Sequence, residues 1–98
     1  MDVNENNIIY IILSELVKFN PKRIGIFGSY ARNVQNNESD PDVLVKFNTP
    51  ISLFQMIRIE NSMTQAIGIK VDLVSENSIK NKRLKALIEK DIKVIYHD

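Results

Sequence analysis

Three short apolar runs, each bounded or interrupted by small or acidic residues, constrain this chain more than any other feature. Residues 24–27 and 43–45 are joined by a polar segment that begins with Gly28-Ser29 and ends with Asp40-Pro41-Asp42. A third run, residues 71–74, contains Asp72 as its one charged member. Short apolar runs bounded by turn residues predict buried strands. We therefore expect a tight turn at the end of one strand and carboxylates on the two strands that follow.

The rest of the chain alternates between helical and strand patterns. The stretch 8–13 belongs to a helical pattern, although its β-branched content is also compatible with a buried strand. Ser52-x-x-Gln55 is a capping-box pattern, and Gly68 can end the helix that it opens. The expected order is helix 4–19, strand 23–27, strand 41–47, helix 52–68, strand 69–74, a basic helix from Asn77 or Ser78, and strand 92–96.

The apolar positions of the later helices complete the fold prediction. The second helix is expected to present the apolar face Leu53, Met56, Ile57, Met63 and Ile67, and the last helix to carry Leu84, Leu87 and Ile88. Helices that alternate with strands predict an α/β (α+β) domain around a small sheet. Because 98 residues are the length of one domain, we expect residues 1–98 to form a single unit.

Composition excludes several classes of protein. A net charge of +1 predicts no strong non-specific attraction to nucleic acid or to an anionic membrane. The chain has no cysteine, which excludes disulfides and thiolate metal sites. The longest apolar run, residues 8–13, is far shorter than the ~20 residues that span a bilayer. We expect a cytoplasmic protein with no membrane partner.

The aspartates suggest a metal site. Asp40 and Asp42, two apart on a strand, share a face, and two neighbouring carboxylates repel each other unless a proton or a cation lies between them. Oxygen ligands favour Mg²⁺ or Mn²⁺, and two such ions are a common arrangement in phosphoryl transfer. Asp72 is the natural third ligand if its strand lies beside that of Asp42, or it orients the attacking hydroxyl. Gly28 and Ser29 are suited to hold phosphate.

The way in which these residues meet is also constrained. The turn and the aspartates come together most simply if the first two strands run antiparallel. Alternatively, a short helix over residues 30–32, capped by Ser29, folds the chain back. Each part has an ordinary interpretation as well: Gly28-Ser29 as a simple turn, residues 39–42 as a loop, and Asp72 as an outward-facing strand residue. The combination in this order favours metal-dependent nucleotidyl transfer.

The pattern of Gly28-Ser29, ten intervening residues and Asp40-x-Asp42 resembles the DNA polymerase β-like nucleotidyltransferases. Within them, the short chain and the run around Asp72 resemble the minimal nucleotidyltransferase (MNT) antitoxins of HEPN/MNT toxin–antitoxin pairs, over nearly the whole chain. The resemblance implies a small mixed β-sheet flanked by helices, ATP as donor and Mg²⁺ as cofactor. It implies that Asp40, Asp42 and Asp72 form the metal site and that Gly28 and Ser29 hold the nucleotide's phosphates. The implied acceptor is a tyrosine of the partner HEPN ribonuclease toxin, which the transfer of AMP neutralises.

Other functions remain open from the sequence. One is an antitoxin without catalysis that acts by direct contact, and another is a nucleotidyltransferase with a small-molecule or RNA acceptor. Six cations over residues 80–93 suggest nucleic-acid binding. The acidic residues that dilute them and the lack of an aromatic residue among them argue against it. Tyr10 and Ile11, off the main stripe of the first helix, are candidates for docking a partner. An exposed strand edge would allow a homodimer or a hetero-complex.

Overall fold

The computed structural model describes residues 5–28 and 41–98. These residues form three α-helices, two short 3-10 helices and four strands. In chain order they are α1 (Glu5–Leu16), the 3-10 helix Val17–Phe19, β1 (Pro21–Phe27), β2 (Asp42–Phe47), α2 (Leu53–Ile67), β3 (Asp72–Ser75), the 3-10 helix Glu76–Ser78, α3 (Lys82–Asp91) and β4 (Lys93–His97). The helix interpretation of residues 8–13 is therefore confirmed.

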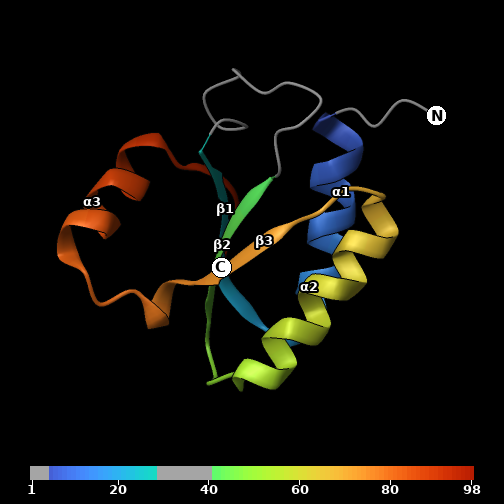
Figure 1. The fold of residues 1–98 in the computed structure, drawn as a ribbon, viewed down its shortest axis with the longest axis horizontal. Coiled ribbons are helices and arrows are strands. Elements are labelled where there is room, and N and C mark those ends of the chain that lie inside the picture. The colour runs from blue at the N-terminus through green and yellow to red at the C-terminus, as the bar shows by residue number, and fades with distance from the viewer. Residues whose placement is uncertain (1–4, 29–40) are drawn as a thin grey trace.

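The four strands form one mixed sheet in the order β3-β2-β1-β4. β1 runs antiparallel to both β2 and β4. β2 and β3 are parallel (Figure 1). The α2 helix makes the crossover between the parallel pair, as a parallel connection requires. The predicted fold class, a small mixed β-sheet flanked by helices, is confirmed.

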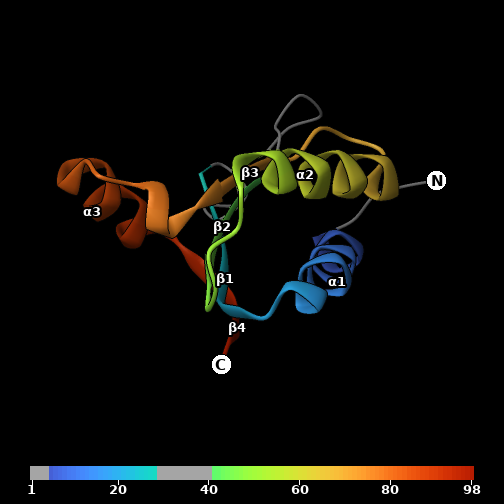
Figure 2. The ribbon, with the colours of Figure 1, turned by 90° about the horizontal axis from the view of Figure 1, so that it is seen from below.

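The helices cover the two faces of the sheet unequally. Both α1 and α2 pack on one face, while α3 lies on the opposite side (Figure 2). The main core fills the space between the first two helices and the sheet. Its buried members are Ile8, Ile12, Leu16, Ile24, Ile26, Val43, Val45, Phe47, Ile59, Met63, Ile67 and Val71. Alternation along β1 and β2 places the residues between these on the face that looks toward α3.

The second helix has the predicted ends but a different buried face. The Ser52 hydroxyl accepts a hydrogen bond from the Gln55 amide at 3.1 Å, and Gly68 ends the helix with φ of 90°. The buried residues are Ile59, Met63 and Ile67, with Met56 partly buried against them. The predictions for Leu53 and Ile57 were wrong: they are 77% and 49% exposed. Both residues line an open pocket beside the edge strand β3, with Leu73 and Val74 across from them, and are not packed into the core.

The start of the last helix was also predicted incorrectly. Residues 76–78 form a separate 3-10 turn, and α3 begins only at Lys82. The Asn81 side chain caps it, accepting from the Arg83 and Leu84 amides at 2.9 and 3.1 Å. Of its predicted apolar residues only Ile88 is buried, whereas Leu84 and Leu87 remain exposed. The capping interactions of Asn81 therefore set the start of this helix.

Strand boundaries differ from the predictions by up to three residues. β1 begins earlier, at Pro21, because pairing with Phe47 extends the ladder. β2 begins at Asp42, one residue later than predicted, because Pro41 has no N–H to donate. β3 begins at Asp72 instead of Ile69, since it pairs with β2 only from Asp42 onward.

Candidate active site

The turn and two of the predicted aspartates come together through strand pairing. Phe27 at the end of β1 lies opposite Asp42, the first residue of β2, and Asp42 lies opposite Asp72, the first residue of β3. Directly paired residues share a face of a sheet. The three side chains therefore form a row across neighbouring strands on the face away from α1 and α2. The antiparallel alternative for the first two strands is confirmed.

Gly28 follows Phe27 and turns the chain directly beside the first of these carboxylates. Its φ is 77°, a left-handed conformation that side chains with a Cβ rarely adopt. A Cβ at this position would lie 2.5 Å from Oδ2 of Asp42. Glycine is thus required both for the turn and for the close approach to Asp42. The same absence of a side chain leaves the backbone here open to a ligand.

Asp72 is held at the start of β3 by the parallel ladder. Its amide donates to the carbonyl oxygen of Pro41 at 3.0 Å, which fixes it next to Asp42. The Asp72 side chain is 43% exposed, and its Oδ1 lies 3.8 Å from Nζ of Lys70. The prediction that the third run lies beside the second is confirmed. Two carboxylates on adjacent strands, both within reach of solvent, form an oxygen-only donor set, which favours Mg²⁺ or Mn²⁺ over zinc.

The remaining predicted site residues, Ser29 and Asp40, lie outside the described residues, as does the short helix expected over residues 30–32. Among residues 5–28 and 41–98, no group of three or more acidic or histidine side chains is arranged to hold a metal ion. Asp42 and Asp72 are two of the three metal ligands that the sequence predicts. The metal site, with Asp40 as its third member, stays a prediction.

An ion network that the sequence did not indicate lies farther along the same face of the sheet. Arg23 of β1 donates hydrogen bonds to the carboxylates of Glu76 and Glu89, the latter from α3. Lys46 of β2 lies 3.8 Å from the carboxylate of Glu76, which is only 7% exposed. The hydrogen bond to Arg23 keeps the pKa of Glu89 below its ordinary value, and the bond to Glu89 raises the pKa of Arg23. Glu76 and Glu89 lie 53 and 66 residues from Arg23 in the sequence, so no local pattern indicates that these charges meet.

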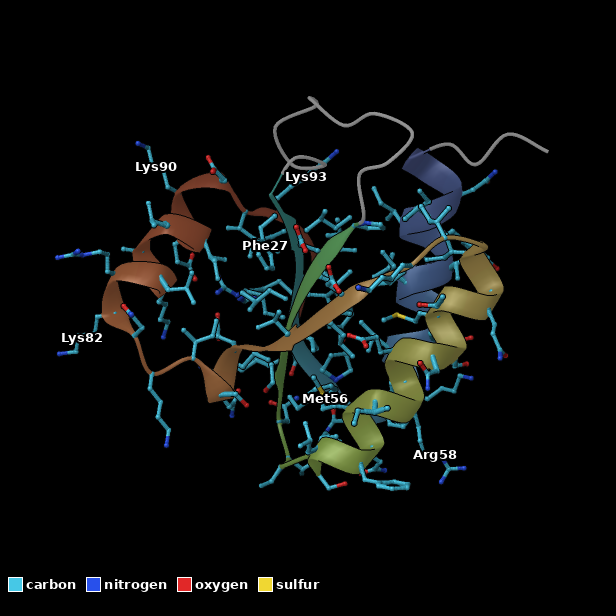
Figure 3. The ribbon with its side chains drawn as sticks, in the orientation of Figure 1. Phe27, Met56, Arg58, Lys82, Lys90 and Lys93 are labelled. Atoms are coloured by element: carbon cyan, nitrogen blue, oxygen red, sulfur yellow. The ribbon has the colours of Figure 1, made fainter. Side chains whose placement is uncertain are left out.

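The other surfaces that the sequence singled out are now placed. Tyr10 is 71% exposed on α1, whereas Ile11 packs against the core. Lys82 and Lys90 of α3 point away from the sheet (Figure 3). His97 is exposed. None of the helices in the described part of the chain is long and apolar enough to cross a membrane.

Comparison with known proteins identifies the family. A model of the polymerase β nucleotidyltransferase family matches residues 6–98. The chain belongs to this family. A Methanocaldococcus jannaschii protein, provisionally named a protein adenylyltransferase, is 48% identical over 75 residues, which are 76% of each chain. The predicted resemblance is therefore confirmed, and the protein is a nucleotidyltransferase.

Solved structures agree on the fold. A toxin–antitoxin structure with AMP-PNP superposes with a TM-score of 0.84 at 22% identity, covering 92% of this chain and 73% of that one. A structure of a tri-AMPylated Shewanella oneidensis HEPN toxin in complex with an MNT antitoxin gives a TM-score of 0.80 at 18% identity, covering 97% and 74%. At these identities the superpositions show a shared fold, which means the same arrangement of helices and strands.

Proposed function

We propose that this nucleotidyltransferase is an antitoxin that transfers AMP from ATP to a tyrosine of a partner HEPN-type toxin and thereby neutralises it. The observation that carries the proposal is the pairing of Asp42 with Asp72 directly beside the Gly28 turn. A phosphate-binding turn next to paired carboxylates is the arrangement that nucleotidyl transfer needs. The adenylyltransferase relative and the AMPylated toxin complex support the choice of AMP and of a protein acceptor.

Each site residue has a proposed role. Asp40, Asp42 and Asp72 would hold one or two Mg²⁺ ions, with Mn²⁺ as a substitute, and Gly28 and Ser29 would hold the phosphates of ATP. When bound, the ions supply positive charge that offsets the charge developing on the transferred phosphoryl group. The tyrosine oxygen forms a bond to the α-phosphorus, and the bond to pyrophosphate breaks. Asp72 would orient that hydroxyl or accept its proton.

The choice of a protein as acceptor is supported by the proteins that this chain is similar to. The Methanocaldococcus jannaschii relative is provisionally named a protein adenylyltransferase. The HEPN toxin in the Shewanella oneidensis complex is tri-AMPylated, and it is therefore an example of a protein that accepts AMP.

Intact-mass spectrometry tests the proposal. The candidate HEPN partner, taken from the neighbouring reading frame, would be incubated with this protein, ATP and Mg²⁺. Parallel reactions would use the site variants Asp42→Asn and Asp72→Asn. The control would be Asp98→Asn, since Asp98 is an exposed aspartate outside the candidate site. We expect AMP-sized mass steps on the partner with the natural protein and the control, and none with the two site variants. Fragmentation of the modified partner would locate the tyrosine.

The same experiment separates catalysis from simple contact. If no mass is added but a stable complex still forms and the toxin is inhibited, the protein is an antitoxin that acts by contact. In that case Asp42→Asn would leave inhibition of the toxin's ribonuclease activity unchanged. An enzyme would lose AMP transfer and neutralisation together.

A further inference from the structure

The backbone on both sides of Asp72 is held by side chains from another element. The amide of Val71 donates to Oγ1 of Thr64 at 3.2 Å, and the amide of Leu73 donates to Oε2 of Glu60 at 2.8 Å. Both acceptors come from α2. The amide of Asp72 itself, between them, donates to the carbonyl oxygen of Pro41, the residue before β2.

The pattern follows from the position of β3 at the edge of the sheet. Successive backbone amides in an extended chain point to opposite sides. The amide of Asp72 therefore points toward Pro41, the residue before β2, while those of Val71 and Leu73 point outward. An outer edge with unpaired amides needs cover. Glu60 and Thr64 are one helical turn apart and therefore project from the same side of α2. The helix thus supplies acceptors where a further strand would supply carbonyl groups.

We propose that Glu60 and Thr64 are positioning residues for the active site, holding the peptide groups around Asp72 so that its carboxylate stays opposite Asp42. This inference rests on the proposed role of Asp72. The side chain of Asp72 is 43% exposed, so packing around the carboxylate does little to fix it. Its position is set by the backbone from which it extends, and α2 holds that backbone from outside the sheet.

Two pairs of matched variants isolate the hydrogen bonds. Glu60→Ala and Thr64→Val remove the acceptors, while Glu60→Gln and Thr64→Ser keep an oxygen in nearly the same place. Thr64→Val also preserves the shape of the side chain, so it retains the fold if Glu60→Ala does not. Each full-length variant would be labelled with ¹⁵N for NMR and compared with the natural protein.

Three measurements then distinguish positioning from general stability. The first is amide exchange at Leu73 and Val71, with Val45 in the neighbouring strand as reference. The second is the cross-strand contact between Asp42 and Asp72. The third is the Mn²⁺ concentration at which the NMR signals of these two aspartates reach half of their maximal broadening.

We expect Glu60→Ala to speed amide exchange at Leu73 by about tenfold. Thr64→Val should have a smaller effect at Val71, since hydrogen bonds to charged acceptors are the stronger ones.

The expected consequence at the site is weaker metal binding. Glu60→Ala and Thr64→Val should raise the half-broadening Mn²⁺ concentration several-fold and weaken the cross-strand contact, with Val45 exchange unchanged. Glu60→Gln and Thr64→Ser should keep the Mn²⁺ concentration and the cross-strand contact close to those of the natural protein. Unchanged exchange at Leu73 and Val71, or faster exchange with unaltered Mn²⁺ binding, would overturn the inference. If the natural protein shows no broadening by Mn²⁺, the proposed metal role fails, and the exchange rates and the cross-strand contact alone decide whether α2 positions Asp72.

Discussion

Gly28 and Asp42 are in such close contact that a single added carbon would separate them. A Cβ on Gly28 would lie 2.5 Å from Oδ2 of Asp42, and the glycine has φ of 77°. The turn that ends β1 and the carboxylate that opens β2 are therefore one structural unit.

Gly28→Ala should abolish AMP transfer and lower the free energy of unfolding by more than the ~1 kcal/mol typical of alanine in a left-handed conformation. Gly68→Ala is the matched control, because Gly68 also has a positive φ of 90° but a Cβ there would meet nothing within 4 Å. The control should lose about 1 kcal/mol and keep its activity. Urea unfolding and the intact-mass assay measure the two effects. Equal activity in the two variants would contradict a special role for the Gly28–Asp42 contact.

The packing of Gly25 against Ile92 predicts a second effect. A Cβ on Gly25 would lie 2.4 Å from Cδ1 of Ile92, the residue between α3 and β4. Gly25→Ala should therefore lower the free energy of unfolding by about 1–3 kcal/mol through overpacking. Adding Ile92→Ala should recover part of this loss, so the double variant should be less destabilised than the sum of the two single variants. Additive effects in urea unfolding would show that the two residues do not compete for this space.

Arg23 should be needed mainly because it neutralises a buried charge. Replacing it by methionine leaves the carboxylate of Glu76, 7% exposed, with Lys46 at 3.8 Å as its remaining cation among the ion pairs described above. We expect Arg23→Met to lower the free energy of unfolding by about 3 kcal/mol. The double variant Arg23→Met/Glu76→Met removes both charges and should regain most of that stability. Thermal and urea unfolding of the two variants provide the comparison, and a double variant no more stable than the single one would contradict this account.

Glu89 makes the stability of the protein depend on pH. Its pKa is lowered in the folded state, chiefly by the hydrogen bond from Arg23. A carboxylate with a depressed folded pKa stabilises the protein above its unfolded pKa, near the ordinary 4.5, and loses this contribution as the pH falls through the folded value. Because the side chain is 39% exposed, the contribution should be below about 1 kcal/mol.

Glu89→Gln tests this dependence. Between pH 7 and pH 3, unfolding by urea should show a smaller loss of stability for the variant than for the natural protein, with the curves converging at the acid end. Glu15→Gln is a suitable control, since Glu15 pairs with the exposed Lys18 at 3.4 Å on α1. If the curves of stability against pH are parallel for the natural protein and Glu89→Gln, Glu89 is not the source of the pH dependence.

Part of the site could be predicted because local patterns dictate it. The apolar runs place Gly28 at the end of one strand and Asp42 at the start of another, and strand alternation gives each carboxylate a face. The lateral order of the strands does not follow from these patterns. Asp72 lies beside Asp42 because α2 carries the chain over the sheet to a parallel position, which the residues around Asp72 do not encode by themselves.

The local amino-acid sequence determined the element types, the capping of α2 by Ser52 and Gly68, and the glycine turn next to an aspartate. Each of these features depends on neighbours within a few residues. Tertiary structure alone decided which apolar residues are buried, leaving Leu53 and Ile57 exposed in a pocket beside the edge strand β3. It also decided that Arg23 meets Glu89 and that Glu60 meets Leu73. These contacts join residues distant in sequence, and their partners are fixed only when the sheet and helices pack together.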